Sequence, residues 1–426
     1  MGAIDELAPT AGLFDGDSLK GLEWLPQRPP PSVGQMPQVQ NHPTEKLTVS
    51  GVFAGIGGLE EGFRRAGYAS GMLCELDPLA RAVLKRHFPD ADITTDITTL
   101  KELPRSDIVT AGFPCQDLSQ VGRRKGISGP NSGLIEYLFG LLRRSTQHPR
   151  WLVIENVPFM LNLDRGRAIR TITAALEELG YSWAYRTIDA RAFGLPQRRR
   201  RVVLLASKTC DPRPVLLGVD AGPPDPAKRG SHACGFYWTE GNTGLGWAVD
   251  SVPPLKGGSA LHIPSPPAIW FPRRRFIGVP AIEDAERLQG FAAGWTHVGE
   301  SDRHGERQRW RMVGNAVSVP MAKWIAERLS ASVVEFKAND PVSLPSDRGW
   351  PSAAWGHGGK QGQSDVSEWP VAVPSPHLIS FLEHRIAPLS KKATAGFHSR
   401  LIQSCLRYEE AFERDLRYHK RNAEKY

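Results

Sequence analysis

The chain has 426 residues, of which 40% are hydrophobic and 23% charged, a composition that excludes a disordered or fibrous chain and suggests two or three globular units. Its 53 Lys and Arg residues outnumber 45 Asp and Glu residues, and the net charge of +8 favours a polyanionic partner without identifying it. The five cysteines are scattered, without a CxxC pair or a close Cys/His cluster, which argues against a disulfide framework and a metal site.

We expect a soluble cytoplasmic protein with no membrane association. The N-terminus lacks an export pattern, and no apolar run reaches the ~20 residues that span a bilayer. Residues 1–46 carry prolines among polar side chains, which predicts a flexible arm.

From Leu47 onward, short apolar runs alternate with helical patterns, as in repeated βαβ units. A helix should follow Asp77-Pro78, where an N-cap residue precedes proline at the first helical position. Another helix should carry Ile169 and Leu176 on one face and end at Gly180. Residues 47–209 are therefore predicted to form a doubly wound α/β domain. Its strands are expected at Thr48–Phe53, Ala69–Cys74, Ile108–Ala111, Leu152–Ile154 and Val202–Leu205.

The second half of the chain lacks this regular alternation. Residues 210–280 are rich in Gly, Pro and Trp and predict a smaller, irregular unit. Helical patterns over Ile282–Phe291 and Val317–Leu329 indicate that residues 281–331 return to the first domain. Residues 332–426 should form an extension, a loop followed by a basic amphipathic helix. We expect its apolar stripe to dock against the protein rather than contact DNA: Phe397, Leu401, Cys405, Tyr408, Phe412 and Leu416.

Glycines and carboxylates follow the first predicted strands. The FAGIGG segment at Phe53–Gly58 lies where a strand meets a helix, so its backbone can approach a ligand closely, although such a cluster is more often only a tight turn. Glu75 ends the next strand, where open α/β sheets commonly present a carboxylate to ribose hydroxyls. Asp96 and Ile97 follow the third unit and are candidates to flank an adenine.

The later strands bring reactive groups to the same edge. GFPCQ places Cys115 after a strand; alone it would be interpreted as a small buried hydrophobe. Glu155 and Asn156 end the next predicted strand, and QRRRR at 197–201 opens a later one. Four arginines in a row usually form a solvated surface, but strand alternation directs one pair, Arg199 and Arg201, to a single face.

In this order, FAGIGG, GFPCQ, ENV, QRRRR and GNAV resemble the DNA (cytosine-5) methyltransferase family, over about residues 47–329. The resemblance implies a Rossmann-like methyltransferase domain that moves a methyl group from S-adenosylmethionine to C5 of a cytosine flipped out of a DNA duplex. Cys115 would add to C6, and Glu155, in a dry site that raises its pKa, would donate a proton or hydrogen bond to N3. Arg199 would contact O2, Arg201 would organise Cys115 and Glu155, and Asn156 would orient the proline-cysteine loop.

The resemblance also implies the cofactor site and the DNA contacts. Residues 210–280 resemble the target-recognition domain, in which its tryptophans are expected to form a local core. The candidate DNA contacts are Lys256, Arg273, Arg274 and Arg275. The implied cofactor residues are Phe53, Gly55, Gly57, Gly58, Glu75, Leu76, Asp96, Ile97, Pro114 and Asn315.

The sequence departs from the family pattern at three places. Leu118 stands where phenylalanine is usual, Gly51 replaces an acidic residue often found before FAG, and Pro254-Leu255 occupies the place of a Thr-Leu pair.

Three alternative functions are a tRNA cytosine-5 methyltransferase, a catalytically silent DNA-binding relative, and a cysteine-redox protein. The long basic insert argues against the first, intact Cys115, Glu155 and Arg199 against the second, and the missing resolving cysteine against the third. We expect a monomer that belongs to a restriction-modification system, with a separate cognate endonuclease as a possible partner.

Overall fold

A computed structural model describes residues 46–113, 133–227, 230, 232–240, 244–257, 266–298, 303–331 and 343–425. Residues 1–45 of the predicted N-terminal arm and two predicted site residues, Pro114 and Cys115, lie outside this part of the chain. No helix within the described ranges combines the length and apolar character needed to cross a membrane.

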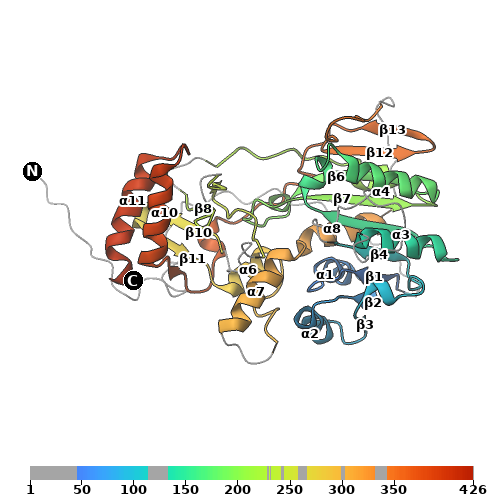
Figure 1. Cartoon of the computed structure of the whole chain (residues 1–426), viewed down its shortest axis with the longest axis horizontal. Helices are drawn as coiled ribbons and strands as arrows, with labels where there is room; N and C mark the ends of the chain where they lie inside the picture. Colours follow the sequence, from blue (N-terminus) through green and yellow to red (C-terminus); the bar gives the residue numbers. More distant parts are fainter. Residues whose placement is uncertain are drawn as a thin grey trace, which may run out of the picture.

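A nine-stranded sheet organises the larger end of the molecule, in the order β13-β12-β6-β7-β5-β4-β1-β2-β3 (Figure 1). Strands β3, β2, β1, β4 and β5 pair in parallel, and the pairings from β5 to β7, β6, β12 and β13 are antiparallel. All five predicted strands are confirmed, with small differences at their ends. The strands are β1 (Thr48–Val52), β2 (Ala69–Cys74), β3 (Asp92–Thr94), β4 (Ile108–Ala111), β5 (Trp151–Asn156), β6 (Ser182–Asp189), β7 (Arg200–Ser207), β12 (Ala353–His357) and β13 (Lys360–Gln363).

The strand order reverses next to β1, because the chain builds β2 and β3 on one side of β1 and then crosses to β4 on the other. In doubly wound sheets, ligands bind at the carboxyl ends of the strands at such a reversal. Two apolar clusters cover the faces of the sheet. The helices of this domain are α1 (Gly58–Arg65), α2 (Pro78–His87), α3 (Leu134–Arg144), α4 (Arg167–Glu178), α5 (Pro212–Leu217) and α8 (Val319–Ser330).

Two of these helices confirm the sequence signals directly. The Asp77 carboxylate accepts hydrogen bonds from the backbone nitrogens of Leu79 and Ala80 at the start of α2. Helix α8 returns late in the chain to pack against α1, at a distance set by Gly62. A Cβ on Gly62 would come within 2.4 Å of Ala322 Cβ, so a larger residue would force the two helices apart.

The prediction that the C-terminal extension begins with a loop is wrong in one respect. Two strands in this segment, β12 and β13, extend the edge of the main sheet. Buried Arg186 on β6 helps to hold this segment. Its Nε donates to the Ser367 carbonyl oxygen at 2.7 Å, and its Nη2 pairs with Asp220 at 2.7 Å. The two strands are short and are joined by a turn at Gly358-Gly359, so their periodicity is too brief to distinguish them from a loop.

A second, five-stranded sheet forms the other end of the molecule, in the order β14-β11-β10-β8-β9 (Figure 1). Its strands are β8 (Cys234–Phe236), β9 (Ala248–Val249), β10 (Ala268–Phe271), β11 (Phe276–Val279) and β14 (Ala387–Pro388), and helices α10 (Lys391–Gln403) and α11 (Glu410–Asn422) cover it. The predicted local tryptophan core is confirmed, since the Trp247 and Trp270 rings lie 5.7 Å apart and both contact Phe412.

The extension therefore docks on the protein as expected, but through two helices rather than one. Phe397 and Leu401 lie on α10, and Phe412 and Leu416 on α11; all four are buried against the second sheet. Tyr408 and Cys405 lie in the connection between the helices and are exposed. A helical period alone does not reveal such a break.

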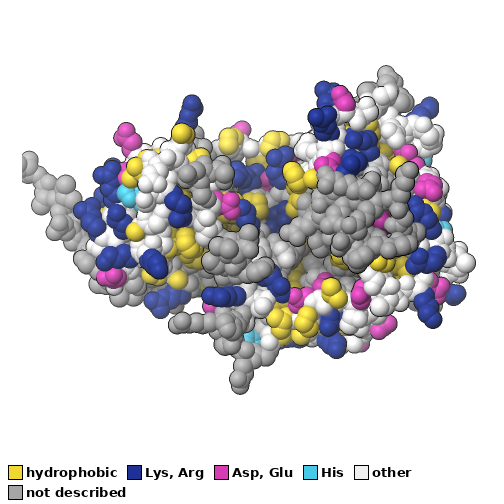
Figure 2. Space-filling model, viewed as in Figure 1, with side chains coloured by type: hydrophobic (Ala, Val, Ile, Leu, Met, Phe, Trp, Pro, Cys, Tyr) yellow, Lys and Arg dark blue, Asp and Glu magenta, His cyan; other side chains and the backbone are white. Residues whose placement is uncertain are grey.

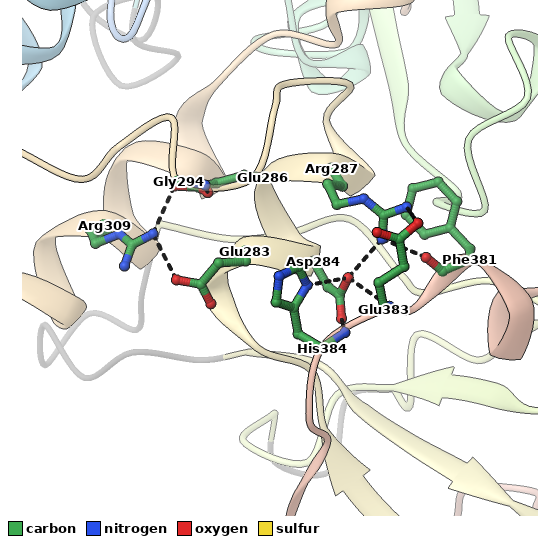
Figure 3. Close-up of polar contacts among 9 residues, drawn as sticks. All are labelled: Glu283, Asp284, Glu286, Arg287, Gly294, Arg309, Phe381, Glu383 and His384. Atoms are coloured by element: carbon green, nitrogen blue, oxygen red, sulfur yellow. Dashed lines mark hydrogen bonds and ion pairs between the residues drawn. The ribbon is translucent and has the colours of Figure 1, made fainter. Parts of the chain in front are cut away.

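Between the two sheets, a network of buried charges fixes α6 (Ile282–Leu288) and α7 (Arg303–Asn315) (Figure 3). Buried Glu286 accepts hydrogen bonds from the backbone of Gly294 at 2.5 Å and from Arg309 at 3.1 Å. Buried Asp284 accepts from the backbone nitrogens of Glu383 and His384 at 3.1 and 3.0 Å, so the extension is tied to α6. The short remaining elements are α9 (Leu378–Phe381) and the 3-10 helices Ile97–Thr99, Pro158–Leu161, Ala190–Ala192, Pro272–Arg274 and Ala423–Lys425.

Candidate active site

A pocket of about 540 Å³ opens at the carboxyl ends of β1, β2 and β4, where the strand order reverses. This volume lies within the range of about 300–1,000 Å³ that small-molecule sites occupy. Helix α7 closes the pocket from the far end of the sequence. Six predicted cofactor residues line it: Phe53, Gly55, Gly58, Glu75, Leu76 and Asn315.

The glycine-rich loop adopts a conformation that few residues tolerate. Gly55 and Gly57 have φ values of 57° and 81°, and Phe53 has the left-handed φ of 59° that a non-glycine residue rarely adopts. The Gly55 nitrogen donates to Glu75 Oε2 at 2.7 Å, which ties the loop to the end of β2. A Cβ on Gly58 would lie 2.6 Å from the Val317 carbonyl oxygen, so the GNAV segment lies directly against the loop.

Three predicted cofactor residues do not line the pocket. Gly57 packs against the Phe88 ring, and a Cβ on Gly57 would come within 2.4 Å of that ring. Asp96 accepts a hydrogen bond from the Thr98 nitrogen at 2.8 Å, where it caps the 3-10 helix Ile97–Thr99. Ile97 is buried in the main core. These contacts account for the three residues as parts of the scaffold.

Glu60 is a pocket residue that the motif comparison did not identify. It reaches from α1 across the face of Gly51, where a Cβ would come within 2.2 Å of Glu60 Oε1. The Thr110 hydroxyl donates to Oε1 at 2.6 Å, whereas Oε2 is buried and has no hydrogen-bond partner among the described residues. Burial raises the pKa of Glu60 from 4.5 to about 7. The glycine at position 51, where an acidic residue is often found, was the signal in the sequence that another acid could occupy this space.

Replacing Glu60 with glutamine should stabilise the protein when no cofactor is bound. The folded state holds the Glu60 proton more tightly than the unfolded state, so this contribution to stability falls as the pH rises from 4.5 to 7. Urea denaturation should show little difference between wild type and Glu60→Gln below pH 4.5. Above pH 7 the variant should be more stable by roughly 3 kcal/mol. Equal stabilities at pH 8 would show that the carboxylate is not strained by burial.

Glu155 and Arg201 form a buried ion pair beside the pocket. Glu155 Oε1 lies 2.9 Å from Arg201 Nε, and the two side chains are 9% and 12% exposed. Burial raises the pKa of Glu155 against the opposing effects of Arg201 and Arg199. The carboxyl group is therefore biased toward its protonated form, as the sequence predicted, while a guanidinium fixes its orientation.

Asn156 holds the backbone that leads into the GFPCQ segment. Its Nδ2 donates to the Phe113 carbonyl oxygen at 3.0 Å, and its Oδ1 accepts from the Val157 nitrogen at 2.9 Å. A Cβ on Gly112 would lie 3.7 Å from Glu155 Oε2, so the strand end before Pro114 and Cys115 runs beside the Glu155 carboxyl group. Cys115 itself lies outside the described residues.

Arg199 has a different environment from the one the sequence implied. It is 1% exposed, and its Nη1 donates to the Leu255 carbonyl oxygen at 2.9 Å. Its Nη2 donates to the carbonyl oxygens of Gly314 and Ala316 at 3.0 and 2.7 Å. Both terminal nitrogens are thus bonded within the protein, whereas the buried Nε has no hydrogen-bond partner among the described residues. Arg199 joins three segments: the segment that contains Leu255, the GNAV segment and the start of β7.

Arg199→Met should lower the free energy of unfolding by about 3 kcal/mol. The substitution leaves three buried carbonyl oxygens without their donor, and each charge-assisted hydrogen bond contributes about 1.5–3 kcal/mol before the cost of burying the charge is subtracted. Urea denaturation measures the loss. The control is Arg200→Met, because Arg200 is an exposed neighbour paired with Glu368 on the surface and should cost less than about 1 kcal/mol. Equal losses of stability in both variants would show that the buried hydrogen bonds of Arg199 do not stabilise the fold.

The predicted DNA-contacting residues lie in the second unit and are partly engaged there. Lys256 Nζ lies 2.6 Å from Glu240 Oε1 and 3.9 Å from the centre of the Tyr237 ring. Arg275 lies 3.3 Å from Asp415 on α11 and stacks over Tyr418. Arg273 is exposed, and Arg274 is half-buried with a pKa lowered by burial.

Comparison with known proteins gives consistent results. The family model described as C-5 cytosine-specific DNA methylase matches residues 47–215. Type II methyltransferase M2.BsuMI of Bacillus subtilis (strain 168) is 47% identical over 368 residues, which cover 83% of this chain and 93% of the relative. Type II methyltransferase M.MspI of Moraxella sp is 34% identical over 180 residues, 40% of this chain and 42% of the relative.

Among solved structures, the S. pombe Dnmt2 methyltransferase is similar with a TM-score of 0.50 and 17% sequence identity. The match covers 67% of this chain and 98% of that one. At this identity the likeness establishes the Rossmann-like fold and nothing about the substrate.

Proposed function

Because the chain belongs to the C-5 cytosine-specific DNA methylase family, we propose that the Glu155–Arg201 pair and Cys115 form the catalytic centre beside the cofactor pocket. The enzyme is a DNA cytosine-5 methyltransferase that uses S-adenosylmethionine. The observation that carries the site assignment is the Glu155–Arg201 ion pair next to the strand end that leads into Pro114-Cys115. Burial there raises the pKa of Glu155, which agrees with a role as an acid.

The pocket residues suit the cofactor. The Glu75 carboxylate already accepts from the Gly55 and Asp77 nitrogens, at the strand end where a ribose would lie. Phe53, Gly55, Gly58 and Asn315 also line the pocket. When bound, the cofactor supplies an electrophilic methyl group. The roles of Gly57, Asp96 and Ile97 are then indirect, through the loop and the core that they support.

Cys115 acts as the nucleophile. Its thiolate adds to C6 of the flipped cytosine, and the new S–C6 bond turns C5 into an enamine carbon that can take the methyl group. Loss of the C5 proton to a base and expulsion of the thiolate then restore the aromatic ring. Asn156 is a positioning residue, because its amide holds the Phe113 carbonyl oxygen two residues before Cys115.

Glu155 acts as the acid toward N3, where negative charge develops when the thiolate adds to the ring. Arg201 orients that carboxyl group. We assign the contact with the base oxygen to Arg201 rather than Arg199, because Arg199 is committed to three carbonyl oxygens and is more deeply buried. This assignment revises the roles that the sequence resemblance implied for the two arginines.

The second sheet with α10 and α11 is proposed to recognise the DNA target. On the face shown in Figure 2, Lys and Arg side chains gather over the end of the molecule that α10 and α11 form. Arg273, one of the predicted contacts, is exposed. Lys256 and Arg275 would have to exchange protein partners for phosphates. We further propose a cytoplasmic monomer that works with a separate restriction endonuclease.

The deciding experiment is methyl transfer from labelled S-adenosylmethionine to unmethylated genomic DNA and, in parallel, to tRNA, followed by bisulfite sequencing of the product. Methylated cytosines confined to one short duplex motif would support the proposal and identify that motif. Transfer to tRNA alone would move the assignment to the RNA-directed alternative. Binding to DNA without any transfer would favour a silent relative.

A further inference from the structure

Among the described residues, four charged side chains line the pocket: the acids Glu60, Glu75 and Asp77, and the cation Arg311. Arg311 is paired with Asp77, so these two charges largely cancel. Both Glu75 oxygens accept backbone hydrogen bonds, from the Gly55 and Asp77 nitrogens. Glu61, the neighbour of Glu60 on α1, pairs with Arg64 and Arg65. Glu60 is therefore the pocket carboxyl group whose charge is left without a partner.

The Glu60 carboxyl group occupies space beside a glycine, and one of its two oxygens has no hydrogen-bond partner among the described residues. Gly51 on β1 provides the space, because any Cβ there would collide with Glu60 Oε1. Thr110 on β4 anchors Oε1 at 2.6 Å, and Oε2 has no hydrogen-bond partner in the described part of the chain. A buried carboxyl oxygen without a partner is costly, so it commonly marks a position that a ligand completes.

We propose that Glu60 is the residue that binds the positively charged methionine end of S-adenosylmethionine, and that it gives up its proton to solvent when the cofactor enters. The proposal rests on the assignment of this pocket to the cofactor. The sulfonium and the α-ammonium group both carry positive charge, and an ionised carboxylate at the wall neutralises that charge in a site that excludes water. The FAGIGG motif on which the resemblance rests ends at Gly58, so Glu60 lies outside it.

The raised pKa of Glu60, about 7, supports this mechanism and sets the sign of its pH dependence. Below pH 7 the free pocket holds a neutral acid, which must lose its proton before it can pair with the cation. Cofactor affinity should therefore rise with pH and level off above 7. Burial raises the pKa of Glu60 most, and hydrogen bonds oppose it. The negative charge of Glu75 raises this pKa further.

The test is isothermal titration calorimetry of the full chain with S-adenosylmethionine, in buffers of different ionisation enthalpy. For wild type, the dissociation constant should fall more than tenfold between pH 5.5 and pH 7, where an α-amino group stays protonated, with close to one proton released at pH 5.5. Glu60→Gln should bind with no proton release and no pH dependence. The same titration with S-adenosylhomocysteine, which has the ammonium group but no sulfonium charge, shows which of the two charges Glu60 binds. Proton release that persists with this ligand would assign the contact to the ammonium group, and its loss would assign the contact to the sulfonium.

Two controls separate a charge effect from a structural one. Methylthioadenosine, which carries neither positive charge, should bind wild type and Glu60→Gln alike at every pH. Thr110→Val keeps Glu60 but removes the hydrogen bond that favours its ionised form, so the pH midpoint should move upward even if Glu60→Gln folds poorly. Equal proton release in wild type and Glu60→Gln would overturn the inference. Absence of cofactor binding at any pH would instead contradict the assignment of the pocket.

Discussion

Cys115→Ala should reduce methyl transfer to DNA below detection. Without the thiolate, C5 of cytosine keeps the electron density of an aromatic ring and cannot attack the methyl group at a useful rate. Binding of S-adenosylmethionine should persist, because the pocket is lined by other residues. The measurement is incorporation of labelled methyl groups into unmethylated DNA, with calorimetric titration of the cofactor on the same preparation.

Cys210→Ala is the matched control for this experiment. The pKa of the Cys210 thiol is lowered, since hydrogen bonds from Arg150 and Thr209 outweigh the opposing effect of burial. Arg150 precedes β5, whereas Glu155 lies near the carboxyl end of that strand, so Cys210 lies near the opposite edge of the sheet from the proposed catalytic centre. Its replacement should leave methyl transfer unchanged. Residual transfer by Cys115→Ala would reject the covalent mechanism.

Glu155→Gln should lower kcat by about 10²–10⁴-fold, the usual contribution of a positioned general acid. Glutamine keeps the size of the side chain and can still donate a hydrogen bond, but it cannot transfer a proton to N3. It also leaves Arg201 without a buried counter-charge. Burial raises the pKa of Glu155, so wild-type activity should fall as the pH rises through that pKa, and the variant should lose this limb of the pH profile.

Single-turnover methylation across a pH series, with wild type and Glu155→Gln side by side, measures both effects. Glu178→Gln is the surface control, because Glu178 on α4 is 68% exposed and its pairing with Arg143 contributes little. A Glu155→Gln enzyme with wild-type kcat would remove Glu155 from the proposed chemistry. A lost affinity for DNA with unchanged kcat would assign it to binding alone.

Local patterns in the sequence were sufficient for much of the main domain. The strands before Phe53, Glu75 and Glu155 were predictable because buried parallel strands are short continuous apolar runs with turn residues after them. The N-cap at Asp77 was predictable for the same reason, since its hydrogen bonds join residues two and three positions apart. Short motifs in family order then identified the pocket loop and the enzyme family.

The sequence could not reveal interactions between distant segments. Arg199 and Arg201 share one strand face, and only the folded chain shows that one binds the carbonyl oxygens of Leu255, Gly314 and Ala316 while the other pairs with Glu155. The break between α10 and α11 depends in the same way on the sheet they cover.

Glu60 is the clearest case of this difference. The sequence alone showed that position 51 holds a glycine instead of an acidic residue, because the identity of a residue can be read at a single position. That the carboxyl group of Glu60 fills the space beside Gly51 and bonds to Thr110 depends on where α1 crosses β1 and β4. Burial and charge are properties of the assembled environment, so the pKa of about 7 at this position was decided by the tertiary structure.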